Sequence, residues 1–338
     1  MKKTQKALMV ISLVIVIGVS LGFFAYSEAG KPVDLSSNEN IYLRIPAGYG
    51  TTQIASLLKQ NGLIRNTTLV KLMARINNLD GKLQEGEYYF RKSMSTNQIL
   101  DKIVKGEVIR YSFTIPEGYT VKQIAALLAR LGYVNEDKFL ELARNGDYNV
   151  GFEYKLAKVK EPLEGFLFPD TYSYAKGMSE DSIIKMMIAN FSKNMTSEII
   201  NKGAELGMDP HKIVTVASLI EREAKLANER YLVSSVIHNR LRISMRLQLC
   251  ATVMYILPVP KTTLLNSDLE IDSPYNTYKY SGLPPGPISS PGSASLQAAV
   301  NPENTDYLYF VAKNDGGHIF SRTFAEHQKA IDEIRRGK

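Results

Sequence analysis

A glutamate at the end of an apolar run is the side chain best placed in this sequence for acid–base chemistry. Glu221 follows the mostly apolar stretch 213–220, and helical spacing puts the small residue Ala217 one turn before it. Burial among apolar groups raises the pKa of a carboxyl group, as a general acid near neutral pH requires. The alternative interpretation is a surface residue paired with Lys225 one turn later.

Two further titratable residues near this point have less clear roles. Glu223 lies two positions after Glu221, about 200° around a helix, so the two cannot line one cleft equally. His318 follows a Gly-Gly turn and suits either a site or a turn.

The proline-rich tract 283–292 suggests a rigid loop of the kind that lines a cleft for an extended polymer. Close before it, Asn276 offers an amide for hydrogen bonds, and Tyr278 and Tyr280 offer rings on which sugars stack. A plain connecting loop and tyrosines that belong to the core remain the alternatives.

The elements that must position these residues follow from local patterns. Asp209-Pro210 is typical of a helix start, and the apolar residues after it surround the helix almost completely, which predicts a central, buried helix. Asn-Asp-Gly-Gly at 314–317 predicts a hairpin turn. We therefore expect helices over 212–226, 230–241 and 324–336, a strand over 307–312 and a return strand from 318.

An internal repeat occupies the first half of the chain. The segment 45–49 (IPAGY) matches 115–119 (IPEGY) at an offset of 70, and the match continues through the apolar positions that follow, to Gly62 and Gly132. Each copy predicts a strand, a turn and a helix that ends at its glycine. A weaker second match has an offset of 84, which predicts an insertion near 162–169. The repeat is either a duplicated scaffold or a wall-binding module.

The N-terminus predicts a membrane anchor. Lys2, Lys3 and Lys6 precede an uncharged run from 7 to 26, and twenty helical residues at about 1.5 Å each span roughly 30 Å of hydrocarbon. A cleavable signal peptide is the alternative, although its apolar region is usually shorter. The lysines favour a cytoplasmic N-terminus with the rest of the chain outside.

Composition narrows the partners and cofactors. The net charge of +7 suits a polyanion, but no Lys/Arg run favours nucleic acid. With one cysteine, Cys250, and four histidines, a zinc site is a poor interpretation, and no Gly-rich nucleotide loop occurs. We expect no metal and no cofactor.

Several short motifs together resemble the MltG or YceG-like family of endolytic murein transglycosylases. They span most of the chain and occur in the same order. The motifs are LEGFLFPDTY (163–172), ASLIERE (217–223), VIHNRL (236–241), MRLQ (245–248), YNTY (275–278), GLPPGPI (282–288) and YLYFV (307–311).

The resemblance implies an α+β protein that cuts glycan strands of peptidoglycan, with Glu221 as its catalytic residue. We predict Glu223, Gln248, Asn276 and Tyr278 as substrate-binding residues. The resemblance also implies a LysM-like module and contact with peptidoglycan synthases. The expected order is a cytoplasmic tail (1–6), a transmembrane signal anchor (7–26), a linker (27–40), the LysM-like module (41–112), a second repeat with a connecting subdomain (113–196) and a catalytic domain (197–338).

One departure from the family pattern lies after Gln248. The family usually has Ser or Thr followed by Asp, where this chain has Leu249 and Cys250. If that aspartate supports the cleft, the change weakens activity or alters a substrate contact. Because Glu221 is present, an inactive enzyme does not follow.

The implied reaction breaks the bond between N-acetylmuramic acid and N-acetylglucosamine and leaves a 1,6-anhydro end, which in nascent strands would limit strand length. An ordinary glycosidase needs two carboxylates, but here the C6 hydroxyl of the sugar attacks, so one carboxyl can act as acid and then as base. The alternatives are a non-catalytic wall-binding or division scaffold, and a hydrolase that leaves reducing ends.

Overall fold

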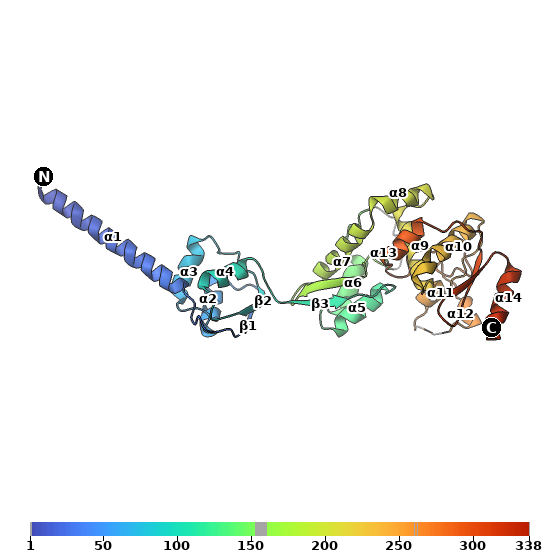
Figure 1. Cartoon of the computed structure of the whole chain (residues 1–338), viewed down its shortest axis with the longest axis horizontal. Coiled ribbons are helices and arrows are strands. Elements are labelled where there is room, and N and C mark those ends of the chain that lie inside the picture. Colours follow the sequence, from blue (N-terminus) through green and yellow to red (C-terminus); the bar gives the residue numbers. More distant parts are fainter. Residues whose placement is uncertain (1, 153–160, 260, 262, 338) are drawn as a thin grey trace. The chain divides into compact units, whose positions relative to one another are not determined.

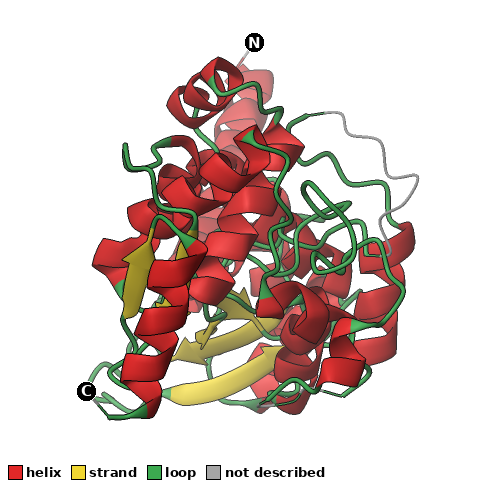
Figure 2. Cartoon of the chain, turned by 90° about the vertical axis from the view of Figure 1, so that its right-hand side faces the viewer, coloured by secondary structure: helices red, strands yellow, loops and turns green. Residues whose placement is uncertain are grey.

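The computed structural model describes residues 2–152, 161–259, 261 and 263–337. The chain is a mixed α+β protein with many helices and short strands (Figures 1 and 2). Its contacts divide it into two compact units, the first made of residues 1–112 and 173–177 and the second of 113–172 and 178–338. The finer division expected at 196 stays a prediction.

The first unit contains one long helix and a two-stranded sheet covered by short helices. Its elements are α1 (Lys2–Gly30), β1 (Ile41–Ile45), α2 (Thr51–Gln60), α3 (Thr67–Ile76), β2 (Gly86–Phe90) and α4 (Thr96–Val104). Strands β1 and β2 are antiparallel, with Ile41 opposite Phe90. Alternation along β1 buries Leu43 and Ile45 in the core of this unit, as the period of a strand requires.

Helix α1 is longer than the predicted apolar span. Within the described residues it is the one helix long and apolar enough to cross a bilayer, over Ile11–Glu28, and that stretch is not buried. Such a helix fits either a membrane anchor or a signal sequence. It continues through Gly18 and Gly22 to Gly30, two residues before Pro32, so the first residues of the expected linker 27–40 are helical.

The same order of elements, strand, two helices, strand and helix, occurs a second time. These elements are β3 (Arg110–Thr114), α5 (Val121–Arg130), α6 (Glu136–Asn145), β4 (Thr171–Ala175) and α7 (Glu180–Asn194). Strands β3 and β4 pair with each other, and the boundary between the two units falls within both. Gly62 and Gly132 follow α2 and α5 with positive φ, as expected for glycines just past a helix end.

The rest of the second unit is built around α9 (Figure 1). It consists of α8 (Ser197–Glu205), α9 (Pro210–Glu223), the 3₁₀ turn η1 (Ala227–Glu229), α10 (Arg230–Arg242), α11 (Cys250–Ile256), α12 (Asn266–Leu269), α13 (Ser293–Val300), β5 (Tyr309–Ala312), β6 (His318–Ser321) and α14 (Phe324–Arg335). The predicted hairpin and closing helix are confirmed, and β5 pairs antiparallel with β6.

Helix α9 is the buried central helix that its sequence predicts. Asp209 caps it by accepting a hydrogen bond from the Lys212 N–H at 2.8 Å, and every residue from Ile213 to Ile220 is buried. Helices α8, α10, α11 and α13 pack around it. The predicted end at Leu226 is wrong: the helix ends at Glu223, and Ala224 is extended.

Gly165 ties three of the sequence motifs together. Its φ is +86°, and a Cβ there would lie 2.6 Å from the Pro287 side chain and 3.0 Å from that of Val214. The LEGF segment, the proline-rich tract and α9 therefore meet at a point where only a glycine fits.

A second close approach fixes α8 against α9 and gives a stability test. A Cβ on Gly203 would lie 2.7 Å from Ile213 Cγ1. We expect Gly203→Ala to destabilise the fold by about 1–2 kcal/mol, because overpacking a core outweighs the helix propensity gained. Urea unfolding of the detergent-solubilised chain measures this. Ala204→Gly, at an exposed neighbour on α8, controls for propensity alone. Stabilisation by Gly203→Ala would show that Ile213 yields without cost.

Candidate active site

Glu221 lies in the last turn of α9 with its carboxylate almost buried. Its side chain is 6% exposed. Oε2 accepts a hydrogen bond from the Gly292 N–H at 3.0 Å, and Oε1 lies 3.4 Å from Arg230 Nη2. Because α9 ends at Glu223, Lys225 lies beyond the helix. The ion pair of Glu221 is with Arg230 and not with Lys225. The buried position predicted for Glu221 is the one that the structure shows.

Helix ends explain how a carboxylate is accommodated here. Gly292 is the N-cap of α13, and Arg230 is the first residue of α10. The N-terminus of a helix favours a negative charge, whereas the C-terminal end of α9 disfavours one. The α13 N-terminus and the guanidinium thus offset the unfavourable end of α9. Arg230 is fixed in turn, since its Nε donates to Ser295 Oγ on α13 at 3.1 Å.

A second carboxylate, Glu117, shares the same guanidinium. Its Oε2 lies 3.6 Å from Arg230 Nη2, and its side chain is 48% exposed. Burial, followed by the charge of Glu221, raises the pKa of Glu117, and Arg230 opposes both effects. We did not predict Glu117 or Arg230 as site residues. A signal for the first was present, because the repeat has Ala47 where the second copy has Glu117.

The proline-rich tract is docked directly onto α9 and the Glu117 turn. The Ile288 N–H donates to Ser218 Oγ at 3.1 Å. The Gly118 N–H donates to the Ser290 carbonyl at 2.9 Å, and the Ser290 N–H donates to the Tyr119 carbonyl at 2.8 Å. These bonds carry the tract past Glu221 and set Gly292 against it.

Three of the four predicted substrate-binding residues belong to a neighbouring cluster. Glu223 accepts a hydrogen bond from the Ala251 N–H at 3.3 Å, and burial raises the pKa of its carboxyl group. The Gln248 N–H donates to the Thr277 carbonyl at 3.1 Å, and Gln248 is exposed. Tyr278 follows Thr277 and is half-buried.

Asn276 is positioned differently from the other three. It is completely buried, and its amide donates to the carbonyls of Leu269 and Ile271 while its Oδ1 accepts from the Tyr278 N–H. These three bonds satisfy the amide inside the loop. Asn276 therefore shapes the segment that presents Tyr278, and its predicted contact with substrate stays a prediction.

His318 forms a separate pair with Glu229. The His318 ring Nδ1 lies 2.7 Å from Glu229 Oε2, and its backbone N–H donates to Glu229 Oε1 at 2.9 Å. This pair joins β6 to the turn η1 before α10. Among the described residues, no group of three His, Cys, Asp or Glu side chains lies close enough to hold a metal ion.

Comparison of the chain with known proteins shows the family to which it belongs. The YceG-like family matches residues 43–333. The chain belongs to the YceG-like family. It is 36% identical to the endolytic murein transglycosylase of Bacillus subtilis (strain 168) over 328 residues, which cover 92% of this chain and 90% of that protein.

Two further relatives agree with this assignment. The endolytic murein transglycosylase of Streptococcus pneumoniae serotype 2 (strain D39) is 30% identical, and the match covers 92% of this chain but 61% of that protein. The crystal structure of a YceG-like protein from Listeria monocytogenes is 36% identical with a TM-score of 0.59, and the match covers 86% of this chain and 99% of that chain. The resemblance drawn from the motifs is confirmed.

Leu249 and Cys250, where the resemblance implies a hydroxyl residue and an aspartate, lie in the cluster formed by Glu223, Gln248 and Tyr278. Cys250 is the first residue of α11, and its Sγ lies 3.1 Å from the Tyr278 hydroxyl. Burial raises the pKa of the Cys250 thiol, and the hydrogen bond with Tyr278 opposes that rise. The side chain pairs with a predicted substrate-binding residue and does not contact Glu221.

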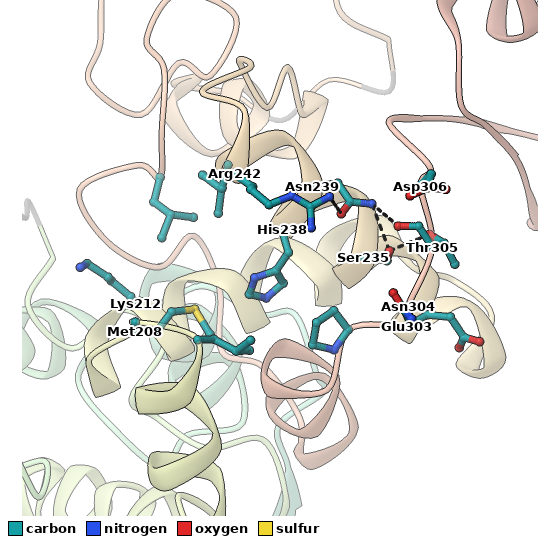
Figure 3. A pocket seen from close by; sticks show the side chains of 15 residues that line it. Met208, Lys212, Ser235, His238, Asn239, Arg242, Glu303, Asn304, Thr305 and Asp306 are labelled. Carbon is teal, nitrogen blue, oxygen red and sulfur yellow. Dashed lines mark hydrogen bonds between the residues drawn. The ribbon is translucent and has the colours of Figure 1, made fainter.

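A pocket of about 620 Å³ lies away from these residues, between the start of α9 and the end of α10 (Figure 3). Lys212, His238 and Arg242 are among the residues that line it, and Asn239 is held there by the Thr305 carbonyl at 2.7 Å. Glu221 lies at the opposite end of α9. None of the predicted site residues lines this pocket, so we do not assign the chemistry to it.

Glu164, in the LEGF motif, gives a pH-dependent stability test. Burial raises the pKa of Glu164 from 4.5 to about 8, against a hydrogen bond from the Val121 N–H at 3.1 Å. A folded-state pKa above the unfolded one stabilises the fold at low pH, and this is lost as pH rises from 4.5 to 8. We expect Glu164→Gln to stabilise the protein relative to wild type by on the order of a few kcal/mol at pH 9, and little at pH 4.

Urea unfolding at both pH values measures this difference. Glu141→Gln, an exposed carboxyl on α6, is the control and should change neither value. Equal effects of Glu164→Gln at both pH values would contradict the raised pKa.

Cys250 gives a chemical test of the altered segment. The thiolate is the reactive form of cysteine, so a raised pKa predicts alkylation by iodoacetamide at pH 7.5 that is slower than that of free cysteine. Tyr278→Phe removes the opposing hydrogen bond and should slow the reaction further. Mass spectrometry of the alkylated protein over time gives the rates, and alkylation faster than that of free cysteine would contradict the prediction.

Proposed function

We propose that this YceG-like protein is an endolytic lytic transglycosylase of peptidoglycan, a lyase that cuts between N-acetylmuramic acid and N-acetylglucosamine. The relatives named endolytic murein transglycosylase support the substrate and the class of reaction. The observation that carries the assignment of a residue is the almost buried Glu221, held by a backbone N–H and a guanidinium at the end of the central helix.

In this mechanism Glu221 acts twice. As a carboxylic acid it gives its proton to the glycosidic oxygen as the bond to C1 breaks. The sugar's own C6 hydroxyl then forms a new bond to C1, and its proton passes to the Glu221 carboxylate, which restores the acid. The Gly292 N–H and Arg230 stabilise the carboxylate between the two steps. No water is consumed, so the product carries a 1,6-anhydro end.

The neighbouring cluster would hold the glycan strand. We assign Gln248, Tyr278 and Glu223 to this role. Gln248 is exposed, and its N–H bonds the residue before Tyr278. Glu223 accepts a hydrogen bond from Ala251, three residues after Gln248. Asn276 acts on substrate through the loop that it fixes. Leu249 and Cys250 in this cluster would alter a substrate contact and leave the acid itself intact.

We further propose that α1 anchors the protein in the cytoplasmic membrane and that the residues after α1 lie on the outer side. The exposed apolar stretch Ile11–Glu28 supports an anchor, and the lysines before it support this orientation. Cutting close to the membrane would act on nascent strands and limit their length, and it would bring the protein near peptidoglycan synthases.

Residues 41–112 are proposed to be a LysM-like wall-binding module, and residues 113–196 to contain the second repeat copy. The matching IPAGY and IPEGY segments and the equal order of elements support duplication. A non-catalytic scaffold would share the anchor and this module, so turnover is what separates the two functions.

Digestion of purified peptidoglycan by the detergent-solubilised chain tests the proposed function. We expect anhydro-ended fragments by mass spectrometry, and a loss of at least about 100-fold in rate for Glu221→Gln, since an amide cannot donate the proton. Glu205→Gln, an exposed residue of α8, is the matched control and should retain full activity.

Other outcomes would redirect the proposal. Anhydro ends from the Glu221→Gln protein at the wild-type rate would exclude Glu221 and turn attention to Glu223. Reducing ends would indicate a hydrolase. Glycan binding without any cleavage would favour the scaffold.

A further inference from the structure

We infer that Glu117 is a second catalytic carboxylate, which contacts the sugar over Glu221 and stabilises the positive charge that develops on its ring as the glycosidic bond breaks. This inference rests on the proposed function and adds a residue to the same site. Four features of the structure support it: charge, space, backbone support and a comparison within the chain.

The first feature is the charge balance around Arg230. One nitrogen of its guanidinium, Nη2, lies 3.4 Å from Glu221 and 3.6 Å from Glu117. A single guanidinium neutralises one carboxylate, so when both acids are ionised the group keeps one negative charge. Glu117 is the more exposed of the two acids, at 48% against 6%. The excess charge therefore faces the side from which a substrate arrives.

The second feature is the space that Gly292 leaves. Its φ of −79° is one that any residue adopts, so the backbone does not require glycine there. A Cβ at this position, however, would overlap the Glu117 side chain, which supplies all three of the nearest atoms, two of them from its carboxylate. Gly292 thus holds Glu221 through its N–H and makes room for Glu117 through its missing side chain.

The third feature is the rigid support of the Glu117 turn. Gly118 has a φ of +75°, and the turn is joined to the proline-rich tract by the two backbone hydrogen bonds with Ser290. Arg222, the neighbour of Glu221 in sequence, donates from Nη1 to the Gly118 carbonyl at 3.2 Å. Catalytic electrostatics require this kind of fixed placement, because a charge that must reorganise contributes little.

The fourth feature is the sequence of the first repeat copy. The same turn at 45–49 has Ala47 where the second copy has Glu117, and Gly48 has a φ of +76° that matches that of Gly118. The turn therefore forms without a carboxylate. Glutamate is present in the copy that lies beside Glu221, which points to chemistry and not to folding as its purpose.

In the reaction, Glu117 neither gains nor loses a proton. The proton of Glu221 goes to the leaving oxygen, the C6 oxygen bonds to C1, and the C6 hydroxyl proton goes to Glu221. Between these events the ring has the character of an oxocarbenium ion. An ionised Glu117 stabilises that charge, so protonation of Glu117 should slow the reaction at low pH. The charged groups that act on Glu117 are Glu221 and Arg230, whereas the guanidinium of Arg222 is bonded to the neighbouring Gly118 carbonyl.

Steady-state cleavage of purified glycan strands by the detergent-solubilised chain tests the inference. We expect Glu117→Gln to lower kcat by about 100-fold, the lower end of what one preorganised electrostatic group contributes, with KM changed much less. The fall in rate on the acid side of the pH profile should shift or disappear. Glu117→Asp keeps the charge at a shorter reach and should give an intermediate rate. Circular dichroism and the Tm confirm that each variant is folded.

A double-mutant cycle adds a test in which the substitution at Gly292 changes no charge. Gly292→Ala keeps the N–H that holds Glu221 but displaces the Glu117 carboxylate, so it should slow cleavage in the wild-type background. In a Glu117→Ala background the added methyl group meets no carboxylate, and Gly292→Ala should then have little further effect. Equal slowing in both backgrounds would overturn the inference, because Gly292 would then act on Glu221 alone.

The outcomes separate this inference from the proposed function. Wild-type kcat and an unchanged pH profile in Glu117→Gln, while Glu221→Gln is inactive, would overturn the role of Glu117 and leave the transglycosylase intact. Hydrolytic products with the expected Glu117 effects would overturn the transglycosylase and retain Glu117. Absence of cleavage by the wild type would overturn both.

Discussion

Burial of a carboxylate at the C-terminal end of an apolar helix is the constraint on which the second unit depends. The C-terminal end of α9 disfavours the negative charge of Glu221, and near-complete burial keeps most of the solvating water away from the carboxylate. The N-terminal residues of two other helices stabilise this charge: α13 contributes the Gly292 N–H and α10 contributes Arg230. The packing of α10 and α13 on α9 therefore also places the groups that stabilise the Glu221 carboxylate. A substitution that shifts this packing would change the electrostatics of the site as well.

The sequence predicted this construction best where local physics decides it. The start of α9 follows from Asp209-Pro210, and its burial follows from apolar residues on all sides. The C-terminal hairpin was likewise predictable from the turn chemistry of 314–317. The end of α9 was not, because no glycine or proline marks Ala224, and the helix stops through contacts made elsewhere in the fold.

The site was predictable only in part, for a similar reason. Glu221 is predictable from α9 alone, but its partners come from three other segments: the IPEGY turn, the start of α10 and the tract before α13. Arg230 has nothing in its local sequence to set it apart. The sequence shows Asn276 only as an amide in a loop, which can bond the loop's own carbonyls or a ligand, and the structure adds its bonds to the carbonyls of Leu269 and Ile271.

The division of the chain into units also has a consequence for its synthesis. Residues 173–177 belong to the first unit, where Lys176 lies 3.1 Å from the buried Glu87. A nascent chain emerging from its N-terminus therefore cannot complete the first unit when residue 112 appears, and must first produce the whole of α5 and α6. Lys176, which pairs with Glu87, is synthesised almost ninety residues after it. The two units should consequently mature together, and not one after the other.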